Sequence, residues 1–360
     1  MIPAAKPIIG DEERAAVDRV LRSGMLAQGP EVAAFEEEFS KFVGGRHCVA
    51  MNSGTSALHL GFIAAGIKPG DEVIVPSFSF AATANSVVLA GGVPVFADID
   101  PKTFNLDPDH AESLITKKTK AIMPVHLYGH IAAMDRFEEI SKKHGVAIIE
   151  DAAQGHLASL NGKNSGEFGV VASFSFYPTK NMTAGEGGMV VTESAEIARM
   201  LRLLRNQGQE IRYQNEVIGF NTRMTDIHAA IGRVQLAKLS GWTAQRQANA
   251  AYLDANLKGV ITPFVAPNST HSYHQYTIRI AGGDAKVRDE FMKRIGEKGV
   301  GSGVYYPTPI HRLPSFNLNL DLPETELVIK ECVSLPVHPA LSQSELETIV
   351  SVVNEVAAAL

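Results

Sequence analysis

A lysine lies in a glycine-rich loop between two segments with strand-like patterns. Residues Ser173–Phe176 alternate serine and phenylalanine with the period of a β-strand, and Pro178 interrupts that strand because proline has no N–H to donate. Lys180 follows, and the loop 185–188 precedes an apolar strand at 189–191. Such a lysine can be a nucleophilic amine if burial lowers its pKa, although an isolated loop lysine is more often solvated.

Two other polar positions follow expected strands. Asp151 comes directly after an apolar strand at 146–150, where it could approach a flat ring or only cap the next segment. The stretch 52–56 (Asn-Ser-Gly-Thr-Ser) lies between a short strand at 48–51 and a helix from Ala57. A helix N-terminus after a turn of small residues binds phosphate well, but serine or threonine there could also serve only as a helix cap.

The elements around these positions alternate between strand and helix. Several expected strands are continuous apolar runs, as in a parallel sheet with helices on both faces. In such sheets, ligands bind at the carboxyl ends of the strands, and the polar positions above lie at such ends. We expect strands at 72–76, 93–96, 121–125 and 146–150, and helices at 11–21, 31–43, 83–90, 109–115, 134–144 and 197–204.

The pattern changes in the last third of the chain. We expect a long helix over 225–239 and a separate one over 245–257, with a domain boundary near Gly241. A large domain would cover residues 1–240 and a small α+β domain residues 241–360, and the N-terminal segment could pack on the small domain. The small domain would hold segments at 273–280, 287–296 and 303–306 and a closing helix from Ser344.

Composition excludes several classes of protein. The 360 residues carry a formal net charge of −6 with a pI near 6.1, so we expect no nucleic-acid partner. Cys48 and Cys332 are too few for a disulfide framework, and the histidines lack the short spacing of a metal site. The N-terminus lacks the apolar core of a signal peptide, and polar residues and glycines interrupt the apolar run 78–97. We therefore expect a cytoplasmic protein with no membrane span.

The sequence lacks a GxGxxG turn after a strand, a Walker A loop, HExxH and GxSxG. A loop lysine, an acid at a strand end, a phosphate-type helix start and an aromatic segment at 76–80 remain. Together these are the parts of a pyridoxal phosphate site. The lysine forms a Schiff base, the acid keeps the pyridine nitrogen protonated, the turn holds the phosphate, and an aromatic ring stacks on the cofactor.

The chain resembles the DegT/DnrJ/EryC1/StrS family of sugar aminotransferases, which are fold-type-I pyridoxal phosphate enzymes. The resemblance covers nearly the whole chain and is clearest in NSGTSALHL (52–60), GDEVIVPSFSFAATANSV (70–87), IEDAAQ (149–154), FSFYPTKN (174–181) and GFNTRMTDIHAAI (219–231). It implies an α/β fold with a mostly parallel central sheet flanked by helices, and a smaller C-terminal α+β domain.

The resemblance also implies roles for single residues. Lys180 would be the Schiff-base lysine and proton shuttle, Asp151 would pair with the pyridine nitrogen, and Gln154 would lie near the ring hydroxyl. Phe80 would stack on the ring. The phosphate would be held by Gly54, Thr55 and Ser175, with Asn221 from the partner subunit of a homodimer. The substrate would contact Arg223, Tyr305, Tyr306 and His311.

The implied activity is transfer of an amino group from glutamate to a nucleotide-linked keto sugar by a ping-pong mechanism. Lysine at position 180 favours transamination, because relatives that remove a hydroxyl carry histidine there. His130 and the pair Met25-Leu26 depart from the usual family residues and bear on the substrate. Two alternatives stay open. One is the same chemistry on an amino-cyclitol or aromatic precursor, and the other is a regulatory protein that binds the cofactor without turnover.

Overall fold

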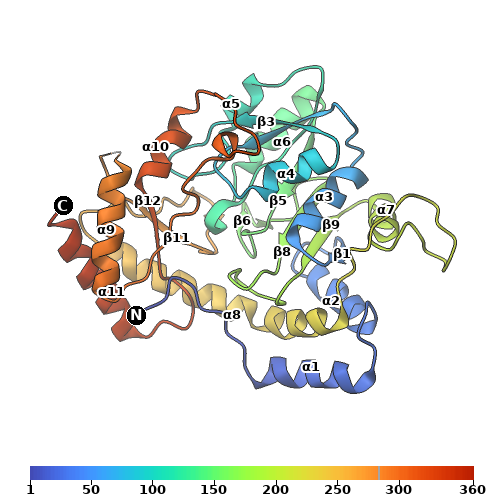
Figure 1. Ribbon diagram of the computed structural model, residues 1–360, viewed down its shortest axis with the longest axis horizontal. Coiled ribbons are helices and arrows are strands. Elements are labelled where there is room, and N and C mark those ends of the chain that lie inside the picture. The colour runs from blue at the N-terminus through green and yellow to red at the C-terminus, as the bar shows by residue number, and fades with distance from the viewer. Residues whose placement is uncertain (283) are drawn as a thin grey trace.

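The computed structural model describes residues 1–282 and 284–360, and a seven-stranded sheet lies at its centre (Figure 1). The neighbouring strands from β8 to β3 are all parallel, whereas β9 runs antiparallel to β1 and to β8. The predicted α/β class with a mostly parallel sheet is thus confirmed. The strands, in spatial order, are β1 (His47–Met51), β9 (Gly188–Thr192), β8 (Val171–Ser175), β5 (Ala147–Asp151), β4 (Thr119–Ile122), β2 (Glu72–Pro76) and β3 (Val93–Ala97).

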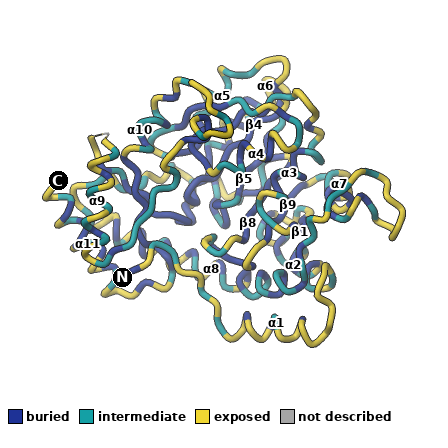
Figure 2. Tube along the Cα trace, viewed as in Figure 1, coloured by how far each residue is buried: buried dark blue, intermediate teal, exposed yellow. Residues whose placement is uncertain are grey.

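Helices cover both faces of this sheet, because successive strand side chains point to opposite faces. On one face, Val49 and Val73 pack with α3 (Gly54–Ala64), α4 (Ala82–Leu89) and α7 (Ala195–Arg205). On the other face, Ala50 packs with α2 (Pro30–Ser40) and the long α8, and Ile74 packs with α6 (Met134–His144). All five residues of β8 are buried, and Figure 2 shows the strands as the buried centre of the molecule.

One helix, α8 (Asp226–Asn256), replaces the two helices expected on either side of Gly241, so that expectation is wrong. Its buried face continues at helical spacing through Leu239, Thr243, Arg246 and Ala250. Because polar residues occupy part of this face, the apolar period stops in the sequence although the helix continues.

The far end of α8 joins a second core. Ala250 and Leu253 of α8 pack with the strands β11 (Tyr276–Arg279) and β12 (Cys332–Leu335) and with the helices α9 (Ala285–Glu297) and α11 (Gln343–Ala357). Ile2 belongs to this core and donates its N–H to Gly299 O at 2.8 Å. Because α8 contributes to both cores, the division of the chain at Gly241 stays a prediction. The segment expected at 303–306 forms no regular strand or helix, only one bridge between Gly303 and Ser334.

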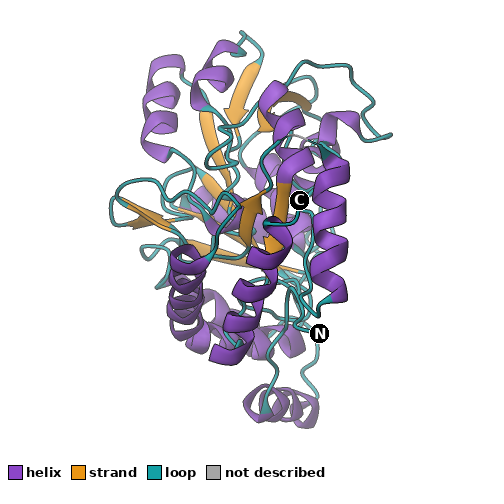
Figure 3. Ribbon diagram, turned by 90° about the vertical axis from the view of Figure 1, so that its left-hand side faces the viewer, coloured by secondary structure: helices purple, strands orange, loops and turns teal. Residues whose placement is uncertain are grey.

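The remaining elements lie around the two cores, and α1 projects below the rest of the chain (Figures 1 and 3). No helix among the residues described above is long and apolar enough to cross a membrane. The other elements are α1 (Asp11–Ser23), α5 (Pro108–Ser113), η1 (Leu127–Gly129), η2 (Ile310–Arg312), α10 (Pro323–Glu331), and a small sheet of β10 (Ser269–Thr270), β6 (Ser159–Leu160) and β7 (Lys163–Asn164).

Candidate active site

A cavity of about 510 Å³ opens at the carboxyl ends of β5 and β8 and at the N-terminus of α3. This is the edge of the sheet where parallel α/β folds place their ligands. Residues of the loop after β8 and of two later segments, at 274–275 and 305–306, complete its wall. Nine of the twelve predicted site residues line it: Gly54, Thr55, Phe80, Asp151, Gln154, Ser175, Lys180, Tyr305 and Tyr306.

Asp151 is the last residue of β5 and is buried at the floor of the cavity. Its carboxylate accepts hydrogen bonds from Thr83 Oγ1 at 2.9 Å and from the Ala153 N–H at 3.1 Å. Burial raises the pKa of Asp151, and these two hydrogen bonds and the charge of Lys180 oppose that rise. The carboxylate is therefore well placed to pair with a cationic nitrogen that enters the cavity.

Lys180 lies in the turn that follows β8, where its N–H donates to Tyr177 O at 2.9 Å. Burial lowers the pKa of Lys180 to about 8, and the charge of Asp151 offsets part of the effect. A lysine with such a pKa carries a much larger neutral fraction near pH 7 than a solvated lysine does. The structure thus removes the main objection to a nucleophilic Lys180.

The turn before α3 forms a cradle for an anion. Ser53 is the N-cap of α3, and its Oγ accepts from the Ser56 N–H at 3.1 Å, while Gly54 and Thr55 line the cavity. The first N–H groups of a helix have no intrahelical acceptor and lie at the positive end of its dipole. A Cβ on Gly54 would lie only 2.7 Å from Ser175 Cβ, so glycine lets the helix start approach β8. Capping by Ser53 therefore leaves Gly54 and Thr55 at the cavity, and their role in holding a phosphate stays a prediction.

Gln154 and two aromatic residues shape the upper wall. Gln154 Oε1 accepts from the Tyr128 N–H at 2.8 Å, and its Nε2 donates to Tyr306 Oη at 3.2 Å. The Phe80 ring lies 5.7 Å from the Tyr306 ring between centroids, and the Phe80 residue is 57% exposed. An exposed ring at the mouth of a cavity leaves a face available for stacking on a flat ligand.

Three predicted residues lie outside this cavity. Asn221 forms a bridge with Asn206 and is exposed, and Arg223 Nη1 donates to Asn206 Oδ1 at 2.8 Å. His311 is fully buried, and its Nδ1 lies 2.6 Å from Ser77 Oγ. Their proposed roles in binding stay predictions.

Sequence reasoning missed several residues that act on the site. Thr83 bonds Asp151 from the first turn of α4, and Tyr128 fixes Gln154. Thr83 lies in the block 70–87 that carries the family resemblance, but no local pattern singles out either residue. His274 and Gln275 also line the cavity, more than ninety positions beyond Lys180, and no sequence signal brings these distant segments together.

The residues present fit pyridoxal phosphate. A cavity with an anion cradle, a buried carboxylate and a lysine of lowered pKa provides a place for the phosphate, the pyridine nitrogen and the aldehyde of this cofactor. Within residues 1–282 and 284–360, no group of three or more histidine, cysteine, aspartate or glutamate side chains could hold a metal ion.

A protein-family profile and two proteins of known name match nearly the whole chain. The sequence profile of the DegT/DnrJ/EryC1/StrS aminotransferase family matches residues 7–354. A "pleiotropic regulatory protein" of Geobacillus stearothermophilus is 42% identical over 94% of this chain and 92% of its own. GDP-perosamine synthase of Caulobacter vibrioides is 38% identical over 98% of this chain and 97% of its own.

Solved structures of aminotransferases also superpose on nearly the whole chain. Streptomyces venezuelae DesV, solved in complex with a ketimine intermediate, superposes with a TM-score of 0.92 at 40% identity, covering 96% of this chain and 94% of its own. Other matching structures of sugar aminotransferases include forms with PLP and with PMP.

Proposed function

Because this chain belongs to the DegT/DnrJ/EryC1/StrS aminotransferase family, we propose that it transfers an amino group from glutamate to a nucleotide-linked keto sugar. The protein is a pyridoxal phosphate-dependent aminotransferase. The observation that carries the proposal is the position of Lys180, Asp151 and the Gly54 cradle around one cavity. Most of the chain is similar to GDP-perosamine synthase and to DesV, which supports a sugar substrate.

Each residue around the cavity has a distinct task in this proposal. The cofactor, when bound, supplies an electron sink for the carbon that gains or loses the amino group. Lys180 would attach the cofactor and, once released, would move a proton at its Nζ. Asp151 would hold the proton on the pyridine nitrogen, with Thr83 keeping the carboxylate in place. Gly54, Thr55 and Ser175 would hold the phosphate.

The proposed substrates carry more negative charge than the cationic side chains that line the cavity can balance. A nucleotide diphosphate and the two carboxylates of glutamate all call for cationic partners. Among the described residues that line the cavity, Lys180 is the sole lysine or arginine, and Asp151 and Glu186 add negative charge. We therefore infer that a second copy of the chain completes the site and supplies Asn221 and Arg223, which lie outside the cavity of their own chain.

The residues at the mouth would contact the sugar. Tyr305 and Tyr306 line the cavity, so they are the strongest candidates among the predicted substrate residues. His311 would act there only if the loop around Ser77 rearranged, because Ser77 holds the buried ring. The cytoplasmic location also stays a prediction.

A regulatory function is the second candidate, because the relative with 42% identity is named a pleiotropic regulatory protein. The two functions differ in turnover. An aminotransferase with bound cofactor converts it to the amine form when glutamate is added, with loss of the visible absorbance of the lysine imine. A protein that only binds the cofactor keeps that absorbance.

The test of substrate class is a panel of nucleotide-linked 3-keto and 4-keto sugars with glutamate as donor, and with amino-cyclitol and aromatic precursors as competitors. We expect an amino sugar from at least one keto sugar, and the position of the new amine identifies the carbon attacked. Turnover of only a cyclitol or aromatic precursor would overturn the proposed substrate class.

A further inference from the structure

Tyr128 has a backbone conformation that is unusual for a bulky residue. It lies in η1 with φ 58° and ψ 4°, which is the left-handed region. Such a conformation costs free energy and is kept only where the surrounding contacts enforce it, which is common at functional sites. The residue is buried and does not itself line the cavity. The groups that its backbone and side chain bind therefore indicate why the conformation is retained.

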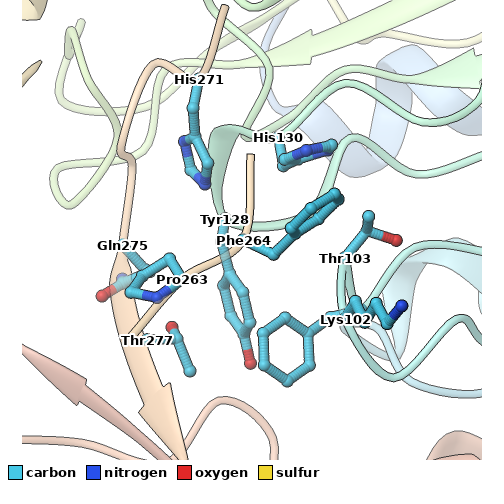
Figure 4. Close-up of a pocket in the computed structure, with 10 residues that line it drawn as sticks. Lys102, Thr103, Tyr128, His130, Pro263, Phe264, His271, Gln275 and Thr277 are labelled. Atoms are coloured by element: carbon cyan, nitrogen blue, oxygen red, sulfur yellow. The ribbon is translucent and has the colours of Figure 1, made fainter. Parts of the chain in front are cut away.

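The backbone of Tyr128 fixes two residues of the cavity wall. Its N–H donates to Gln154 Oε1 at 2.8 Å, and its carbonyl accepts from the Gln275 N–H at 3.1 Å. Figure 4 shows Gln275 beside Tyr128 at this junction. Gln154 and Gln275 both line the cavity. A residue outside the cavity thus joins the loop after β5 to the segment before β11.

The hydroxyl of Tyr128 binds a third segment of the wall, through Tyr305. It donates to the carbonyl oxygen of Tyr305, and burial raises the pKa of the hydroxyl well above its usual range, so the proton stays on it. The ring packs edge-on against Phe78 and Phe104, at 6.3 and 5.4 Å between centroids. Because these contacts hold the ring in place, the hydroxyl cannot follow Tyr305 if that segment moves away.

The segment 304–308 has few other attachments. Before it, Gly303 pairs with β12, and after it, the Ile310 N–H donates to a carbonyl of the loop after β2 at 2.9 Å. In the part of the chain that the structure describes, the Tyr128 hydroxyl is the only group that makes a hydrogen bond to the backbone of 304–308. This segment carries two residues of the cavity wall, so its position determines the shape of the wall.

We propose that Tyr128 is a positioning residue that holds Tyr305 and Tyr306 in the cavity wall and thereby sets the affinity for the keto sugar. The inference rests on the proposed function, in which these two tyrosines contact the sugar. Gln154 adds a second connection, because its Nε2 donates to Tyr306 Oη at 3.2 Å. The backbone of Tyr128 fixes Gln154 on the cofactor side and its hydroxyl fixes Tyr305 on the sugar side, so one residue sets the spacing between the two sides.

Tyr128→Phe removes the hydroxyl and keeps the ring and the backbone hydrogen bonds. Tyr276→Phe is the matched control, because Tyr276 is also buried and its hydroxyl donates to Asp254 Oδ1 at 2.6 Å. Tyr276 belongs to the second core and does not line the cavity. Each variant loses one hydroxyl and one hydrogen bond, so a difference between them comes from the place of Tyr128 and not from a general loss of stability.

The first measurement is limited proteolysis of the full chain by chymotrypsin, which cleaves after tyrosine, with and without pyridoxal phosphate. Cleavage after Tyr305, mapped by mass spectrometry, reports the fraction of molecules in which the segment 304–308 has opened. Loss of a hydrogen bond of ordinary strength should raise this fraction and the cleavage rate about five- to tenfold in Tyr128→Phe. Tyr276→Phe should be cleaved there at the wild-type rate.

The second measurement separates the sugar side from the cofactor side. In Tyr128→Phe, the KM for the keto sugar that the panel identifies should rise about two- to tenfold, and by no more than the cleavage rate does, because binding must then close the segment. The rate at which glutamate converts the cofactor to its amine form should change little, because the hydrogen bond between the Tyr128 N–H and Gln154 remains.

Unchanged cleavage in Tyr128→Phe, or an equal rise in Tyr276→Phe, would overturn the inference. An unchanged KM for the keto sugar, or an equal slowing of the glutamate half-reaction, would overturn it as well. A failure of the proposed function gives a different result, because the wild-type protein would then aminate no keto sugar of the panel. The proteolysis would in that case still decide whether the Tyr128 hydroxyl holds the segment 304–308.

Discussion

Substitution of Gly54 by alanine tests the anion cradle most sharply. The new Cβ would lie 2.7 Å from Ser175 Cβ and 3.0 Å from Ser175 Oγ, whereas ordinary contact begins at 3.4 Å. The start of α3 and the end of β8 must therefore move apart by about 0.7 Å, the difference between 3.4 and 2.7 Å. The two Cβ atoms cannot turn away from each other, because both are fixed to the backbone.

Overpacking of this kind costs about 1–3 kcal/mol, and each 1.4 kcal/mol is tenfold in affinity. If the strain is relieved by moving the helix start away from Ser175, the loss falls on phosphate binding. We therefore expect the Kd for pyridoxal phosphate to rise about five- to hundredfold. The assay is titration of cofactor-free protein with pyridoxal phosphate, followed by visible absorbance.

Gly241→Ala is the matched control. Gly241 lies inside α8, and an added Cβ there meets nothing within 4 Å. This change should leave the Kd unchanged and raise the stability by about 0.5–1 kcal/mol, because alanine is the better helix former. Wild-type affinity in Gly54→Ala, or equal losses in both variants, would refute the assignment of the cradle.

Three other changes test the site and its support. Thr83→Val removes a hydrogen bond that lowers the pKa of Asp151, so the acid limb of the pH–activity profile should move up by about one unit; an unmoved limb would contradict this role. In cofactor-free protein, Lys180→Met should stabilise the fold by up to roughly 3 kcal/mol at pH 7. The reason is that the folded pKa of about 8 lies below the usual 10.5, so burial costs stability below pH 8, and the cost disappears as the pH rises to 10.5. Urea unfolding at pH 7 and pH 10 measures the difference, and equal gains at both pH values would contradict it. Phe176→Ala should lose about 3–5 kcal/mol in urea unfolding, because this buried ring packs against Phe35 and Phe39; a loss below 1 kcal/mol would argue against that core.

The sequence predicts the central sheet well because its strands are continuous apolar runs between turn residues. The strand at 72–76 and the helix at 134–144 have the predicted bounds, and most others differ by one to three residues. The prediction fails at Gly241, where a polar buried face hides a continuous helix, and at the two-residue strands of the small sheet. Such short strands depend on tertiary pairing and leave no period in the sequence.

The site is predictable where its residues follow strand ends. Asp151 and Lys180 are of this kind, because strand direction alone places them at the ligand edge of the sheet. Thr83 and His274 could not be found this way. Thr83 acts through a side-chain hydrogen bond across 68 positions, and His274 reaches the cavity because its segment docks on Gly129. These are long-range contacts that local pattern does not encode.

The central claim is that Lys180 carries the cofactor. The most direct measurement is borohydride reduction of the protein loaded with pyridoxal phosphate, followed by peptide mapping by mass spectrometry. We predict a stable pyridoxyl group on the peptide that contains Lys180, and loss of the visible absorbance of the lysine imine in Lys180→Ala. A pyridoxyl group on another lysine, or an unchanged absorbance in Lys180→Ala that is lost on reduction, would contradict the claim.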